Sequence, residues 1–248
     1  MVRQYDYGAN ARYYDLMDGS MPQYYQISRE LRKRLRHAGN KALDMACGTG
    51  NFTSALMRAG YTIEGSDLSL PMLKIARKKN PGLLFYHADM ASKPKGSYDV
   101  IFCMFNAIGH LDKSKFERML NNAASCSKIL VFDIFNLEFM KKNFISHEFV
   151  DAVRSSEDFK ALRTSHNTLD VKDGVMGIRW FTIMQENGSP VKRIKSSWQM
   201  KIYSAGQLRK MLLKAGFKKV TLLGHFKDGK FGTFDRQKSL SIYAIAEK

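Results

Sequence analysis

The chain has 248 residues, of which 44% are hydrophobic and 12% aromatic, a composition typical of a globular protein with a substantial buried core. Its 40 Lys and Arg outnumber 23 Asp and Glu, and the resulting net charge of +17 favours anionic partners. The three cysteines form no CxxC pair or Cys/His cluster, which argues against a disulfide framework and a metal site. Because the sequence shows no apolar leader or membrane-spanning run, we expect a cytoplasmic protein with no membrane partner.

The first 40 residues predict a helical segment. In "QYYQISRELRKRLRHAG" (23–39), Ile27, Leu31 and Leu35 recur every four residues, as one face of a helix requires, and Gly39 ends the pattern. The basic residues between them are typical of a solvated helix face. We therefore expect residues 1–40 to form an N-terminal helical cap.

Strands and helices alternate from residue 41 to residue 136. The strand segments are short and apolar, and helical patterns separate most of them. They are "KALDMA" (41–46), "YTIEGSD" (61–67), "LLFYHAD" (83–89), "YDVIFCMF" (98–105) and "KILVFDIF" (128–135). This order predicts βαβ units and a parallel sheet covered by helices on both faces.

Residues 137–203 change to long polar/apolar alternations separated by the turn signals "KDG" and "ENGSP". They predict three antiparallel strands. A helix after the N-cap Ser204, ending at Gly216, and two further strands then return to the core. The expected fold is α/β, with a Rossmann-like, doubly wound and mostly parallel sheet of seven strands. Residues 41–136 and 204–248 are expected to form this core, and residues 137–203 an antiparallel three-stranded insertion over the active site.

The turn "DMACGTG" (44–50) predicts a nucleoside-binding loop. Gly48 and Gly50 permit close approach of a ligand to backbone N–H groups at the carboxyl edge of the sheet. Asp67 ends the next strand, seventeen residues after Gly50 (67 − 50), where it can accept both ribose hydroxyls. Thr53 occupies the third glycine position of a GxGxxG fingerprint, which disfavours a dinucleotide. A simple tight turn is the alternative, but the context favours an adenosine-type cofactor.

Four segments in order resemble the class I S-adenosylmethionine-dependent methyltransferases: "LDMACGTG", "EGSDLSLPML", "FYHADM" and "YDVIFCMFNAIGHL". The resemblance implies an enzyme of class EC 2.1.1 that uses S-adenosyl-L-methionine and releases S-adenosyl-L-homocysteine. It implies that the first motif holds the methionine end, that Asp67 binds the ribose, that residues of the second and third motifs enclose the adenine, and that Met104 lies near the sulfonium. The implied cofactor-binding set is Tyr14, Tyr24, Asp44, Ala46, Cys47, Gly48, Gly50, Asp67, Leu68, Met72, Asp89, Met90 and Met104.

The segments "ARYYDLMDGSMPQYY" and "IGHL" and the insertion resemble one subgroup, small-molecule N-methyltransferases that dimethylate amino groups of nucleotide-linked sugars. By that resemblance Tyr14 orients the acceptor or cofactor, Tyr24 contacts the methionine end, and His110 positions the amine or accepts its proton. A histidine that caps the following helix is the alternative for His110. Where members place an acid and a histidine on the third insertion strand, this chain has Ser197 and Trp198.

The expected acceptor is a small, anionic molecule, specifically the amino group of a nucleotide-linked sugar. Candidate substrate contacts are Trp198, as a stacking wall or as core, and the basic residues Arg179 and Lys195. An RNA or tRNA methyltransferase is the second choice, supported by the net charge but weakened because "FNAIGHL" lacks the Asn/Asp-Pro-Pro-aromatic motif. A non-catalytic S-adenosylmethionine-binding protein is the third. We expect a monomer or a homodimer.

Overall fold

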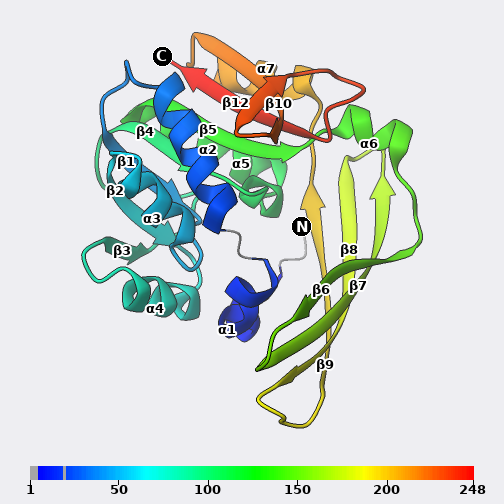
Figure 1. Ribbon diagram of the computed structural model, residues 1–248. Coiled ribbons are helices and arrows are strands. Elements are labelled where there is room, and N and C mark those ends of the chain that lie inside the picture. Colours follow the sequence, from blue (N-terminus) through cyan, green and yellow to red (C-terminus); the bar gives the residue numbers. More distant parts are fainter. Residues whose placement is uncertain (1–4, 19–20) are drawn as a thin grey trace.

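The computed structural model describes residues 5–18 and 21–248, which form an α/β core and a separate antiparallel sheet with helix α1 between them (Figure 1). The expected α/β class, with a mostly parallel Rossmann-like sheet and an antiparallel insertion, is confirmed, but both strand counts differ from the prediction. No helix of the described residues is long and apolar enough to cross a membrane.

The core sheet has the strand order β11-β10-β12-β5-β4-β1-β2-β3, in which β10 is Lys219–Lys227, β11 is Lys230–Thr233 and β12 is Ser241–Glu247. Its five N-terminal strands are parallel, and β12 pairs antiparallel with β5 and β10. The elements of its first half are β1 (Lys41–Met45), α3 (Asn51–Arg58), β2 (Thr62–Asp67), α4 (Leu70–Lys79), β3 (Leu84–His87), β4 (Tyr98–Cys103), the 3-10 helix η1 (Ala107–His110), α5 (Lys113–Cys126) and β5 (Ser127–Phe135).

Helices cover both faces of this sheet, as the apolar strands predict. Alternate residues of β4 show the two sides: Val100 and Phe102 pack with residues of α2 (Met21–Arg34) and α3, whereas Ile101 and Cys103 pack with residues of α5 and α7 (Ala205–Lys214). The buried strands thereby fix a rigid edge at their carboxyl ends.

The C-terminal part adds β10 (Lys219–Lys227), β11 (Lys230–Thr233) and β12 (Ser241–Glu247). The core sheet therefore has eight strands, and the expectation of seven is wrong because it omitted the short edge strand β11. The β10–β11 hairpin turns at Asp228 and Gly229, whose φ angles are 51° and 77°. Two successive residues in the left-handed region are what a tight two-residue hairpin requires, so the "DG" pair was a turn signal that the strand prediction passed over.

The insertion contains α6 (Leu137–Asn143), β6 (Glu148–Ser155), β7 (Phe159–Asp170), β8 (Val175–Glu186) and β9 (Lys192–Lys201). Its sheet has four strands in sequential order, so the expectation of three is also wrong. The missed strand β6 is an edge strand of which only Ala152 is buried, and such a strand lacks the apolar alternation that marks a half-buried one.

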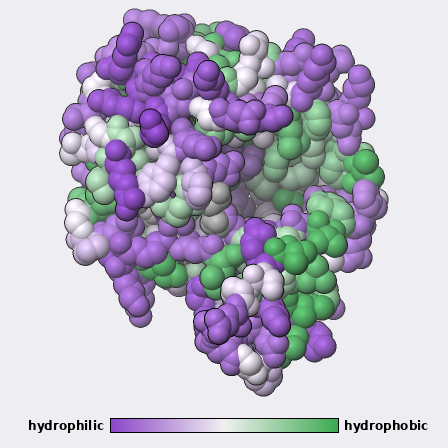
Figure 2. All heavy atoms as spheres, in the orientation of Figure 1, coloured by the Kyte–Doolittle hydropathy of each residue, from purple (hydrophilic) through white to green (hydrophobic). Residues whose placement is uncertain are grey.

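The N-terminal segment forms two helices with different partners. Helix α2 buries Tyr24, Ile27 and Leu31 against the core, as the four-residue spacing predicts. Helix α1 (Tyr7–Met17) instead buries Tyr13 and Met17 against residues of the four-stranded sheet. In the space-filling view, hydrophilic residues dominate the face that carries α2, and hydrophobic residues gather toward the insertion (Figure 2).

Candidate active site

A cavity lies at the carboxyl ends of β1, β2 and β4 and extends to α1. With its open mouth it contains about 1050 Å³ of empty space. Thirteen of the residues expected to bind cofactor or acceptor line it: Tyr14, Tyr24, Asp44, Ala46, Cys47, Gly48, Asp67, Leu68, Met72, Asp89, Met90, Met104 and His110. Four expected residues lie elsewhere: Gly50, Arg179, Lys195 and Trp198.

The glycine turn after β1 presents open backbone to this cavity. Ala46, Gly48 and Gly50 all have positive φ angles, of 56°, 54° and 78°. A Cβ atom added at Gly48 would meet no atom within 4 Å, so the space over it is free for a ligand. A Cβ at Gly50 would lie 3.0 Å from Phe85. Gly50 therefore serves the packing of the turn against the core, which explains why it does not line the cavity.

Asp67 fixes the glycine turn from the neighbouring strand. Its Oδ2 accepts a hydrogen bond of 2.8 Å from the backbone N–H of Gly48, and its Oδ1 accepts one of 2.8 Å from Ser69. Burial raises the pKa of the Asp67 carboxyl, and these N–H donors oppose the shift. The carboxylate retains further acceptor positions on the cavity side.

Asp44, at the end of β1, is a second buried carboxyl in the cavity wall. Desolvation raises its pKa from 3.8 to about 7, although Thr53 Oγ1 donates to Asp44 Oδ2 at 2.7 Å. Asp89 lies farther along and accepts a 2.8 Å bond from the N–H of Ala91. Among the described residues that line the cavity, three are acids and none is Lys or Arg, so the cavity suits a cationic ligand despite the net charge of the chain.

His110 lies where the cavity meets α1. Its Nε2 lies 2.8 Å from the hydroxyl of Tyr7, and its Nδ1 is buried without a hydrogen-bond partner among the described residues. Burial lowers the pKa of His110 from 6.5 to about 4. The imidazole is therefore neutral at physiological pH, and its buried Nδ1 has no partner among the described residues.

The loop after β4 is held in a strained conformation beside His110. Phe105 and Asn106 have φ angles of 63° and 59°. The buried Asp133 carboxylate at the end of β5 accepts from the N–H of Phe105 at 2.5 Å and from the N–H of Asn106 at 3.3 Å. Asp133 thereby positions Phe105 and the following 3-10 helix at the cavity.

The two basic substrate candidates lie on the outer face of the four-stranded sheet. Cross-strand register pairs Arg179 with Ser197 and Lys195 with Phe181, on the face opposite to buried Trp198 and half-buried Trp180. The structure does not bring either cation to the cavity. Trp198 is 5% exposed and packs with Met176, Ile178 and Met200, which is the core use considered for it from sequence.

The inner face of that sheet meets α1 in a second, smaller cavity. Tyr5 and Tyr14 line both cavities, and the second is also lined by Arg163 and Trp180. The Arg163 guanidinium lies 3.6 Å above the Trp180 ring and bonds to Asp18 at 2.6 Å and 3.1 Å. An aromatic wall thus continues from the first cavity to the insertion.

Several lining residues were not found from the sequence. They are Tyr5, Tyr7, Thr49, Asn51, Phe52, Ala88, Phe105, Ala107 and Leu111. Thr49 lies within the glycine turn, and Asn51 and Phe52 directly follow it, so adjacency to the motif was a usable signal. Tyr5 and Tyr7 reach the cavity only because α1 folds back over the strand ends, which the local pattern does not predict.

Known proteins match the part of the chain that forms this site. Residues 42–129 match the family described as a methyltransferase domain. The dTDP-3-amino-3,6-dideoxy-alpha-D-glucopyranose N,N-dimethyltransferase of Streptomyces fradiae is 40% identical over 114 residues, which are 44% of this chain and 45% of that relative. Residues 42–129 therefore form a methyltransferase domain, and the fold around them is the Rossmann-like methyltransferase fold. The alignment thus spans less than half the length of this curated relative.

Solved structures show the same fold over nearly the whole chain. An S-adenosylmethionine-dependent methyltransferase from Clostridium acetobutylicum superposes with a TM-score of 0.77 at 18% identity, covering 97% of this chain and 98% of that one. An amino pentose methyltransferase from Micromonospora echinaspora gives a TM-score of 0.73 at 16% identity, covering 91% and 92%. At these identities the likeness concerns the fold.

Proposed function

We propose that this chain transfers a methyl group from S-adenosylmethionine to the amino group of a small molecule. The observation that carries the proposal is the cavity itself, in which an open glycine turn and Asp67 lie at one end and a neutral histidine with a free nitrogen lies at the other. The two ends correspond to the two substrates of a methyl transfer.

The residues of the first cavity fit S-adenosylmethionine. The open space over Gly48 admits the methionine end, and Asp67 has acceptor positions for the ribose hydroxyls. Leu68 and Met72 offer an apolar face for the adenine beside Asp89. Because the cofactor carries a sulfonium, a wall with three acids and no Lys or Arg among the described lining residues favours it electrostatically.

The bound cofactor supplies a methyl group that is already activated, so the protein has to align the acceptor and exclude water. We expect Nδ1 of His110 to accept a hydrogen bond from an acceptor N–H, which requires the protonated Nε2 to donate to the Tyr7 hydroxyl. Since burial lowers the pKa of His110 to about 4, the ring stays uncharged and does not repel the sulfonium. Tyr14 lines both cavities and is suited to orient the acceptor between them.

Within this proposal, the specific acceptor is the amino group of a nucleotide-linked sugar. The name of the Streptomyces fradiae relative describes such a reaction, and the second cavity offers aromatic walls and polar groups suited to a sugar. The four-stranded insertion, residues 137–203, would act as the roof over this acceptor. Without Lys or Arg among the described residues of the first cavity, any diphosphate must extend away from the reacting amine.

Turnover with a panel of acceptors tests the proposal. The purified chain is incubated with methyl-labelled S-adenosylmethionine and with nucleotide-linked amino sugars, free amino sugars and unmodified tRNA, and the products are analysed by mass spectrometry. We expect methylated amino sugar. Methylated tRNA would support the second choice, an RNA methyltransferase, and cofactor binding without any product would indicate a non-catalytic binding protein. Cytoplasmic location and a monomeric or dimeric state stay predictions.

A further inference from the structure

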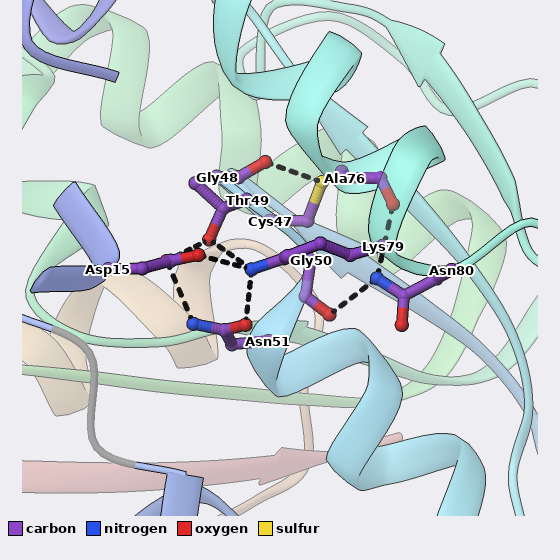
Figure 3. Close-up of polar contacts among 9 residues, drawn as sticks. All are labelled: Asp15, Cys47, Gly48, Thr49, Gly50, Asn51, Ala76, Lys79 and Asn80. Carbon is purple, nitrogen blue, oxygen red and sulfur yellow. Dashed lines mark hydrogen bonds and ion pairs between the residues drawn. The ribbon is translucent and has the colours of Figure 1, made fainter. Parts of the chain in front are cut away.

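Helix α1 is attached to the two parts of the molecule in different ways. Toward the insertion it buries Tyr13 and Met17, and Asp18, the residue after its last turn, accepts a hydrogen bond from Arg163. Toward the glycine turn its attachment is polar and concentrated at Asp15 (Figure 3). The helix therefore bridges the cofactor cavity, with an apolar contact on one side and a hydrogen-bonded one on the other.

The polar contact is a closed network of four side chains. Asp15 Oδ1 accepts from Thr49 Oγ1 at 2.5 Å and from Asn51 Nδ2 at 2.9 Å. The Lys79 ammonium, from the end of α4, donates to Asp15 Oδ2 at 2.5 Å. It also donates to Asn51 Oδ1 at 2.5 Å and to Thr49 Oγ1 at 3.1 Å, the same oxygen that donates to Asp15. All three ammonium protons thus have partners: Asp15 from α1, Thr49 from within the turn and Asn51 from directly after it.

The location of this network links it to the cofactor. Thr49 and Asn51 line the cavity directly beside Gly48, where the methionine end is proposed to bind. Tyr14, the residue before Asp15, lines the same cavity from α1. The side chains of Asp15 and Lys79 are 32% and 30% exposed, so their attraction is only partly screened by solvent. Neither residue lines the cavity.

We infer that Asp15 and Lys79 are positioning residues that hold α1, and with it Tyr14, against the glycine turn, and so determine how long the cofactor stays bound. This inference rests on the proposed cofactor cavity. We expect this contact to slow the release of S-adenosylhomocysteine, because the four-residue network joins α1 to the turn at the methionine end. The apolar contact of α1 with the insertion involves other residues, Tyr13 and Met17, and should not depend on the network.

Dissociation of S-adenosylhomocysteine from the full chain, followed by stopped-flow fluorescence, tests the inference. We expect Asp15→Asn and Lys79→Met each to speed release by about tenfold, since each removes hydrogen bonds to a charged group. Because both variants break one network, the double variant should be little faster than either single variant. Added salt should speed release from the wild type and have less effect on Lys79→Met.

Lys78→Met is the matched control, with the same change one residue earlier on the exposed side of α4. It should release the product at the wild-type rate. Lys79→Arg, which retains the charge, should recover part of the slow release. Wild-type rates in both Asp15→Asn and Lys79→Met, or accelerations that multiply in the double variant, would overturn the inference. If Asp67→Ala abolishes binding of S-adenosylhomocysteine while Asp15→Asn releases it at the wild-type rate, only this inference is overturned. If the wild-type chain does not bind S-adenosylhomocysteine at all, the proposed cofactor cavity is overturned as well.

Discussion

The core and the insertion present functional residues in different ways. In the core, ligand-facing residues stand at the ends of buried parallel strands, so Asp44 and Asp67 are positioned by backbone that cannot move independently. In the insertion, the candidate acceptor-binding side chains stand in mid-strand, where facing inward or outward depends on register alone. Motifs therefore place the cofactor end of the site, whereas the acceptor end depends on which face of a sheet meets α1.

The largest expected effect lies in the core. Asp67→Ala removes both the proposed ribose acceptor and the bonds to the N–H groups of Gly48 and Ser69. We expect cofactor affinity to fall by at least about a hundredfold, since charge-assisted hydrogen bonds contribute about 2 kcal/mol each. Titration calorimetry with S-adenosylmethionine measures this, and circular dichroism checks that the variant folds. Affinity within threefold of wild type, a roughly 0.6 kcal/mol change, would contradict the assignment.

The next effect lies at the junction of the two regions. His110→Ala should lower turnover on the order of tenfold to a hundredfold, because the acceptor amine loses its hydrogen-bond partner. Cofactor affinity should stay unchanged, since His110 lies at the proposed acceptor end. Tyr7→Phe removes only the hydroxyl that holds Nε2 and should have a smaller effect in the same direction. Steady-state kinetics separate the two, and a histidine that only caps a helix would leave turnover intact in both variants.

The residues of the site also show how much of this molecule can be predicted from the sequence. The parallel strands are predicted because each is a short apolar run bounded by turn signals, and Asp67 is predicted because it ends such a run. Asp133 was missed, although it lies in the predicted strand 128–135, because its partners Phe105 and Asn106 are distant in sequence. Lys79 was missed for the same reason: its partner Asp15 is 64 residues away and meets it only after α1 folds back.

A moderate effect concerns the charge of the core carboxyls. Asp44 has a pKa raised from 3.8 to about 7, so it is half protonated near neutrality and becomes an anion above that pH. An anion attracts the sulfonium of S-adenosylmethionine, and the cation in turn favours release of the proton. Affinity for S-adenosylmethionine should therefore rise by about fivefold as pH is raised from about 6 to about 8 and then level off.

S-adenosylhomocysteine is the control for this charge effect. It shares the amino-acid end and the nucleoside but has no sulfonium, so its affinity should change less over the same pH range. Asp44→Asn should remove the difference between the two ligands. Calorimetry in buffers of different ionisation enthalpy measures the proton released on binding. Equal pH dependence for both ligands would show that Asp44 does not respond to the charge of the cofactor.

The smallest expected effect decides between the two faces of the insertion. Arg179→Ala and Lys195→Ala remove exposed cations from the outer face, and the KM for the acceptor should change by less than about twofold. On the inner face, Arg163 packs on Trp180 and lines the second cavity. Arg163→Met replaces this cation by an uncharged side chain and should raise the KM for the acceptor several-fold. If the acceptor carries a diphosphate that binds outside the cavities, the order reverses and the two outer-face variants lose acceptor affinity. The comparison thereby establishes whether acceptor charge is recognised on the inner face beside α1 or on the outer face, where register places Arg179 and Lys195.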